Sequence, residues 1–104
     1  MKRIFLAIAS LAAGFAVSTP ALADLQLATA KNCMACHAAA TKLVGPSYKE
    51  VAAKYAGQKD AVDKLSAKIV KGGSGTWGPV PMPANAQVTP DEAKKLATWV
   101  LTQK

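Results

Sequence analysis

The stretch NCMACHAAATKL, residues 32–43, holds both cysteines and the only histidine of this 104-residue chain. Cys33 and Cys36 stand three positions apart, and His37 follows directly. Two thiols and one imidazole packed this closely are typical of three kinds of site: a dithiol redox pair, a zinc site, and the covalent attachment of haem. The rest of the sequence distinguishes among the three.

The first two kinds of site lack parts here. A dithiol pair usually stands at a helix start in an α/β domain, and strand signals are nearly absent from this chain. A zinc site needs four ligands, whereas this sequence offers two cysteines and one histidine. C-x-x-C-H is the signal for haem attachment, because on a helical turn both sulfurs reach one porphyrin and the imidazole comes up beneath the iron. We therefore predict one haem c bound through Cys33 and Cys36, with His37 as an axial ligand.

Haem iron has a second axial position, and the sequence offers one candidate for it. A methionine opposite a histidine is a known ligand pair. Met1 leaves with the N-terminal segment described below, and Met34 lies between the cysteines and cannot cross to the other haem face. Met82 remains, in Pro81-Met82-Pro83, where the prolines restrict the backbone to extended shapes. The alternative, that Met82 only fills the core, would leave the iron five-coordinate.

The N-terminus has the three-part layout of a secretory signal peptide. Lys2 and Arg3 are followed by an apolar run of 14 residues from Ile4 to Val17, and the segment ends in Ala21-Leu22-Ala23. A membrane-spanning helix needs about 20 residues, so an uncleaved anchor is the weaker interpretation. We predict cleavage after Ala23, leaving one domain of 81 residues from Asp24 to Lys104 in the periplasm, without stable membrane insertion.

The charge of the predicted mature chain limits its partners. Eleven basic residues, all lysine, against six acidic ones leave a net charge of +5. The lysines form no dense run and arginine is absent from this segment, so nucleic-acid binding is disfavoured and an acidic protein partner is favoured. Such a small domain has a marginal core, and a disulfide over four residues would add little stability. A covalently bound haem would fill that core.

Helix signals dominate the mature chain, so an all-α domain is predicted. Ser47 with Glu50, and Thr89 with Glu92, form capping boxes, and Asp60 is a third candidate cap. Four short helices are expected, over residues 24–37, 45–57, 59–73 and 89–104. Residues 72–88 combine four glycines with three prolines, a mixture that no regular element tolerates, and a loop this long usually has a function.

These motifs together resemble the small bacterial class I c-type cytochromes of the cytochrome c-551/c-552 type. The resemblance covers Asp24 to Lys104 and rests on C-x-x-C-H, then Gly45-Pro46, then Trp77-Gly78-Pro79-Val80-Pro81-Met82-Pro83 with Asn85, and a closing helix containing Trp99. It implies a cytochrome c fold, with four short helices around one haem and a long Gly/Pro loop that carries the methionine ligand.

The resemblance also implies roles for further residues. The carbonyl of Pro46 would accept the ring N–H of His37, Trp77 would donate to a haem propionate, and Asn85 would orient the Met82 sulfur. The first and last helices would cross near Trp99. Plain apolar packing is the alternative for both tryptophans, and for Trp99 we expect packing alone.

Two bound axial ligands leave no open iron position, which favours one-electron transfer over an enzyme activity. We expect a soluble monomer that carries electrons between periplasmic or membrane proteins of a respiratory chain. The resemblance allows a terminal oxidase, a nitrite reductase or a peroxidase as acceptor, docking through an acidic patch onto lysines around the haem edge. Alternatives are a peroxidase-like or ligand-sensing haem protein in which Met82 dissociates, and a haem-free thiol protein that uses Cys33 and Cys36.

Overall fold

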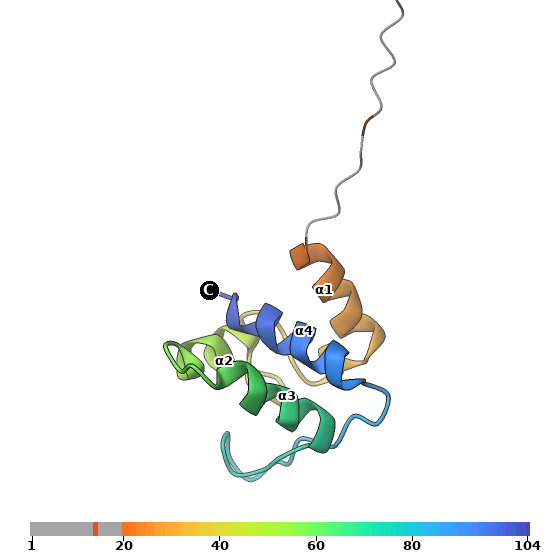
Figure 1. Cartoon of the computed structure of the whole chain (residues 1–104). Coiled ribbons are helices and arrows are strands. Elements are labelled where there is room, and N and C mark those ends of the chain that lie inside the picture. The colour runs from red at the N-terminus through yellow and green to blue at the C-terminus, as the bar shows by residue number, and fades with distance from the viewer. Residues whose placement is uncertain (1–13, 15–19) are drawn as a thin grey trace, which may run out of the picture.

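A computed structural model describes Gly14 and residues 20–104 (Figure 1). The rest of the predicted signal sequence before residue 20 lies outside the described residues. The described part is helical and holds no strand, as predicted: only an isolated bridge pairs Gly73 with Met82. The elements are α1 (Pro20–Ala30), a short 3-10 helix η1 (Cys33–Ala35), α2 (Tyr48–Tyr55), α3 (Ala61–Lys71) and α4 (Pro90–Leu101).

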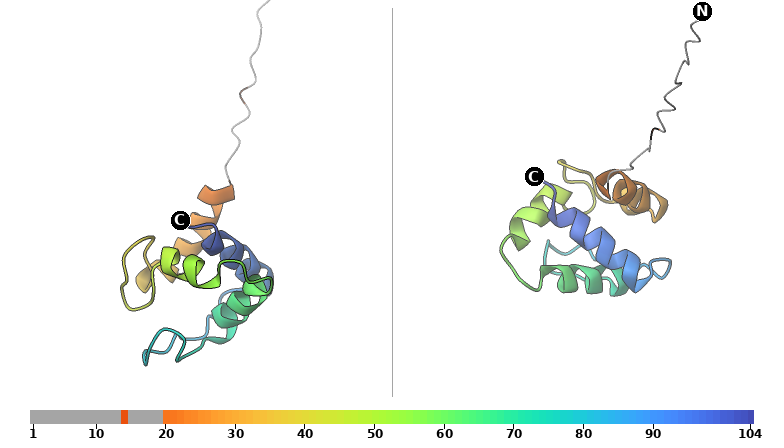
Figure 2. Two further views of the ribbon diagram at one scale, coloured as in Figure 1. Left: turned by 90° about the vertical axis from the view of Figure 1, so that its left-hand side faces the viewer. Right: turned by 45° about the horizontal axis from the view of Figure 1, so that its top comes forward.

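Helix α4 is the centre of the arrangement. It packs against α1, α2 and α3, and α3 shares the longest contact with it. Figure 2 shows α4 running across the domain with α1 beside it, and its left view shows the 72–88 loop below α3. None of the helices in the described residues is long and apolar enough to cross a membrane.

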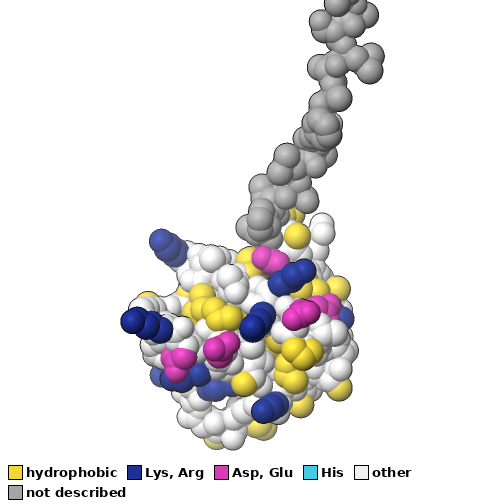
Figure 3. Space-filling model, viewed as in Figure 1, with side chains coloured by type: hydrophobic (Ala, Val, Ile, Leu, Met, Phe, Trp, Pro, Cys, Tyr) yellow, Lys and Arg dark blue, Asp and Glu magenta, His cyan; other side chains and the backbone are white. Residues whose placement is uncertain are grey.

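Charged side chains are spread over the surface rather than gathered. On the face seen in Figure 3, lysines and acidic residues alternate with small apolar areas. This distribution agrees with the absence of a dense basic run in the sequence. A single-sign patch of the kind that holds nucleic acid does not appear on that face.

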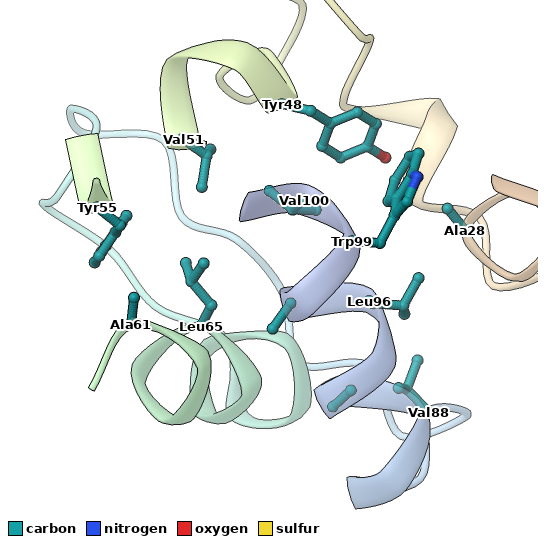
Figure 4. Packing of buried hydrophobic residues seen from close by; sticks show 12 residues of the cluster. Ala28, Tyr48, Val51, Tyr55, Ala61, Leu65, Val88, Leu96, Trp99 and Val100 are labelled. Carbon is teal, nitrogen blue, oxygen red and sulfur yellow. The ribbon is translucent and has the colours of Figure 1, made fainter. Parts of the chain in front are cut away.

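The helical stripes predicted from the sequence meet in one core (Figure 4). Leu96 and Val100 of α4 lie among side chains of α1, α2 and α3. The rings of Tyr48 and Trp99 meet edge to face, with centroids 4.9 Å apart. The buried residues of the core cluster are Ala28, Tyr48, Val51, Tyr55, Ala61, Leu65, Val88, Ala93, Leu96, Ala97, Trp99 and Val100.

Both predicted capping boxes are present. The Glu50 N–H donates to Ser47 Oγ over 3.1 Å, and the Ser47 N–H donates to Glu50 Oε2 over 2.8 Å. The same reciprocal pair joins Thr89 and Glu92, with Pro90 as the first helical residue. The third predicted cap is wrong: Asp60 stands at the N-cap position of α3 without a side-chain cap bond. Its Oδ2 lies 3.3 Å from Lys64 Nζ instead, so an ion pair on the helix surface replaces the cap.

The first predicted helix is also wrong in extent. We expected residues 24–37 to form one helix, but α1 starts at Pro20 and ends at Ala30. Asn32 adopts a left-handed conformation (φ 65°), which a helix cannot include and which asparagine tolerates better than most residues. A separate turn then carries the cysteines, closed by a hydrogen bond of 3.0 Å from the His37 N–H to the Cys33 carbonyl. The predicted cleavage point after Ala23 lies inside α1.

Candidate haem-binding site

A cavity of about 580 Å³ opens between the η1 turn, α4 and two long loops. One loop, residues 36–47, joins η1 to α2, and the other is the Gly/Pro loop, residues 72–88. Cys33, Cys36, His37 and Met82 all line the cavity, although Met82 is far from the others in the sequence. Pro46 and Trp77 line it as well. The fold therefore brings six of the seven predicted site residues around one cavity. The seventh, Asn85, does not line it.

The two cysteines are free, half-buried thiols. Burial raises the pKa of Cys33, and a backbone hydrogen bond lowers it by a smaller amount. A raised pKa keeps this sulfur protonated near neutral pH, and a protonated thiol is a poor nucleophile. The Cys33 thiol is therefore unlike the low-pKa nucleophile of a dithiol redox site.

The His37 ring is fixed by a hydrogen bond at one nitrogen. Its Nδ1 lies 2.7 Å from the Pro46 carbonyl oxygen. A carbonyl only accepts, so Nδ1 carries the proton and donates. In the neutral ring the other nitrogen, Nε2, then has a free lone pair, which is the form that binds a metal. This contact is the one that the resemblance implied for Pro46.

The backbone at Met82 is tied to the end of α3. The Gly73 N–H donates to the Met82 carbonyl over 3.0 Å, and the Met82 N–H donates back to the Gly73 carbonyl over 2.7 Å. Asn85 adds a second tie, since its side-chain nitrogen donates to the Ile69 carbonyl over 2.8 Å and its N–H to the Val70 carbonyl over 3.3 Å. The Met82 segment is thus held at the C-terminal end of α3 at two points, Met82 and Asn85.

Trp77 lies at the open edge of the cavity with 38% of its surface exposed. Lys54 Nζ lies 5.1 Å from the centre of its ring, within the range of a cation–π contact. In the same region Lys68 Nζ donates to Thr76 Oγ1 over 2.5 Å and to Tyr55 Oη over 3.3 Å. These lysines attach the Gly/Pro loop to α2 and α3.

The sequence patterns did not predict several residues that line the cavity. Gly45 entered only as part of a motif, yet the His37 ring lies against it. Trp99 was expected to pack only in the core, but it also lines the cavity. Leu43, Val44 and Val80 line the cavity too, while remaining 48%, 59% and 59% exposed. Exposed apolar residues in loops were the available signal, and only the fold shows that they share one opening.

The residues of the cavity fit a haem. The volume of the cavity is in the range of small-molecule and cofactor sites, and most of the side chains that line the cavity are apolar. Two thiols suit covalent attachment, and a neutral imidazole and a thioether suit the iron. Cys33, Cys36, His37 and Met82 would hold the group.

The all-α fold and this donor set define a class of protein, the small class I c-type cytochromes. The family model described as Cytochrome c matches residues 25–104, and the chain belongs to this family. Its members are electron carriers with covalently bound haem c.

Named relatives support the assignment. Cytochrome c-552 of Hydrogenobacter thermophilus is 61% identical over 82 residues, covering 79% of this chain and 83% of the relative. Cytochrome c-552 of Nitrosomonas europaea is 50% identical over 100 residues, covering 96% of this chain and 92% of the relative. The crystal structure of wild-type Nitrosomonas europaea cytochrome c552 superposes with a TM-score of 0.75 at 51% identity, covering 77% of this chain and 99% of that one.

Proposed function

We propose that the chain from Asp24 onward carries single electrons between redox proteins of a respiratory chain in the periplasm. Haem c would be attached through Cys33 and Cys36, with the iron between His37 and Met82. The bound group supplies the Fe(III)/Fe(II) couple. The observation that carries the proposal is that Met82 and the C-x-x-C-H motif line one cavity.

The hold on the Met82 backbone favours a carrier over the peroxidase-like alternative. Loss of the ligand through movement of this loop would have to break two hydrogen bonds to Gly73 and two from Asn85 to α3. We propose that Asn85 acts mainly by holding this loop on α3, and its orientation of the Met82 sulfur stays a prediction. A donation from Trp77 to a haem propionate is proposed in the same way.

Export is supported by how far the relatives align. The Nitrosomonas europaea cytochrome c-552 sequence aligns with 96% of this chain, but its crystallised form covers only 77%. Cytochrome c-551 of Stutzerimonas stutzeri is 49% identical and aligns over the full length of both chains. A crystallised form that lacks part of the aligned length fits removal of an N-terminal segment such as residues 1–23.

We further propose that partners dock on the rim of the cavity, defined as Leu43, Val44 and Val80. These three apolar residues come from two loops, line the same opening and are exposed. Two lysines line the cavity. Lys68 donates a hydrogen bond to Thr76, and Lys42 is exposed to solvent. Apolar contact would therefore supply most of the binding, and Lys42 would steer an acidic partner. Transient redox interfaces of this kind are small.

Absorption spectra of the purified exported protein test the proposed function. They would be recorded oxidised, reduced, and reduced under carbon monoxide, for the wild type and for Met82→Ala. Sharp low-spin bands that carbon monoxide does not change in the wild type, but does change in the variant, are expected. Mass spectrometry of the same sample checks the N-terminus at Asp24.

Other outcomes point to the alternatives. A wild type that binds carbon monoxide readily would mean a labile Met82 and favour a peroxidase-like or sensing protein. A colourless protein with two titratable thiols would mean a haem-free thiol protein. Either result would overturn the electron-carrier proposal.

A further inference from the structure

The imidazole of His37 lies close against Gly45, with its Cε1 atom nearest. A Cβ atom built on Gly45 would stand 2.5 Å from His37 Cε1, 2.9 Å from Nδ1 and 3.2 Å from Nε2. Real Cβ atoms essentially never come within 3.0 Å of another heavy atom, so the Cε1 and Nδ1 distances are not tolerated. The φ of Gly45 is not in the left-handed region, so glycine is needed here for space alone.

Gly45 cannot easily move away from the ring. Its N–H donates to the Cys36 carbonyl over 2.8 Å, and its carbonyl accepts from the Leu43 N–H over 3.1 Å. The next residue, Pro46, accepts from His37 Nδ1. The loop is therefore tied to the C-x-x-C-H turn on either side of the contact, and a side chain at position 45 would displace the imidazole rather than the loop.

A second contact limits where the ring can go. The Tyr48 ring stacks on His37 with centroids 5.6 Å apart and planes inclined by 27°. Tyr48 is only 4% exposed, and its hydroxyl donates to Met34 Sδ over 3.3 Å. Figure 4 shows its ring against Trp99 in the core. Tyr48 is thus held on two sides and limits how far the imidazole can turn away from Gly45.

We propose that Gly45 is a positioning residue that fixes the rotation of the His37 imidazole, and with it the direction of the ligand plane at the iron. This inference rests on the proposed ligation by His37. It assigns to Gly45 a role separate from that of Pro46, since Pro46 selects the tautomer and Gly45 sets the angle of the ring.

The test compares Gly45→Ala with Gly57→Ala in the haem-loaded protein. Gly57 has a φ of +76°, so alanine strains its backbone, but nothing lies within 4 Å of a Cβ there. Both variants are expected to lose stability. The proton NMR spectrum of the oxidised protein reports the axial ligands, because their orientations together set the pattern of paramagnetic shifts of the haem methyl groups, and Gly45 contacts only the histidine. We expect Gly45→Ala to change that pattern and Gly57→Ala to keep it.

An unchanged pattern in Gly45→Ala would overturn the inference. If that variant does not accumulate, the reduced wild type decides, since a nuclear Overhauser effect between Gly45 Hα and His37 Hε1 is expected and its absence would refute the contact. A wild type without low-spin haem bands would instead refute ligation by His37 and Met82. The two failures are therefore distinguishable.

Discussion

Gly57 and Gly72 have the same backbone angle, φ +76°, but different surroundings. Gly57 follows α2 and faces open space. Gly72 follows α3, and a Cβ there would stand 2.5 Å from the Met82 carbonyl oxygen and 2.8 Å from the Ala84 nitrogen. Glycine at position 57 only ends a helix, whereas glycine at position 72 also lets the Met82 segment lie against α3.

This difference predicts unequal effects of two matched substitutions. Alanine at a positive φ costs roughly 1–2 kcal/mol, and Gly57→Ala should lose about that much. Gly72→Ala should lose more, because its methyl group also displaces backbone at Met82. Urea unfolding measures the stabilities, and carbon monoxide binding to the reduced protein measures ligand loss. Equal stabilities and no carbon monoxide binding would show that the Met82 segment does not depend on Gly72.

At the scale of elements, three helices begin with a candidate cap and two use it. Ser47 and Thr89 each accept a hydrogen bond from the third helical residue, a Glu whose side chain returns the bond. Asp60 makes no such bond and pairs with Lys64 one turn along. Both side chains of that pair are more than half exposed, and exposed pairs of this kind contribute little.

We therefore expect Thr89→Ala to destabilise the protein and Asp60→Ala to change it little. Loss of a working N-cap typically costs about 1 kcal/mol, and loss of an exposed i,i+4 ion pair about 0.3–0.5 kcal/mol. Unfolding midpoints in urea, measured side by side at neutral pH, separate these values. A larger loss in Asp60→Ala than in Thr89→Ala would mean that Asp60 caps α3 in solution.

The elements that sequence patterns predicted are those whose signals are local. A capping box spans four residues, and the buried stripes of α2 and α4 repeat at helical spacing. The left-handed turn at Asn32 was missed because the apolar and small residues around it continue a helical pattern. Asp60 was misjudged because an N-cap and an i,i+4 partner use the same carboxylate, and sequence does not rank them.

The same limit applies to the cavity. C-x-x-C-H is contiguous, so its chemistry is readable, and Met82 followed from the need for a second ligand. The contact of Gly45 with His37 and the shared opening of Leu43 and Val80 depend on how two loops meet, which no short pattern encodes.

At the scale of the whole molecule, one polar cluster joins the end of α1 to the start of α4. Lys31 Nζ lies 3.3 Å from Glu92 Oε1 and donates to the Gln87 carbonyl over 2.9 Å. The Gln87 side chain donates back to the Lys31 carbonyl over 3.2 Å. The pKa of Glu92 is lowered, first by the Thr89 N–H and then by contacts with Lys31 and the Thr89 side chain.

A lowered pKa predicts how stability depends on acid. The contribution of Glu92 is fully present above the unfolded pKa of about 4.3 and is lost as the pH falls through the lower folded value. Glu92→Gln should therefore be less stable than the wild type at neutral pH, and the two should converge on acidification. Lys31→Met should show a smaller effect on the acid limb, because the Thr89 N–H remains. Parallel wild-type and Glu92→Gln curves down to about pH 3 would contradict this assignment.

The proposed docking rim of Leu43, Val44 and Val80 is tested by electron self-exchange, in which two copies of the protein dock on each other. We compare Val80→Lys, at the rim, with Ala53→Lys, an exposed position on α2 that does not line the cavity. Each variant adds one positive charge, so both should exchange more slowly than the wild type at low salt.

Measurements at high salt separate the effect of charge repulsion from the effect of losing apolar contact. Screening should restore Ala53→Lys to the wild-type rate, because its effect is only repulsion between basic molecules. Val80→Lys should stay slower by about tenfold, the equivalent of losing much of one buried valine side chain. NMR exchange between the oxidised and reduced forms gives the rates, and unchanged absorption spectra confirm that the haem environment is intact. Recovery of Val80→Lys at high salt would mean that docking is electrostatic and that the apolar rim takes no part in it.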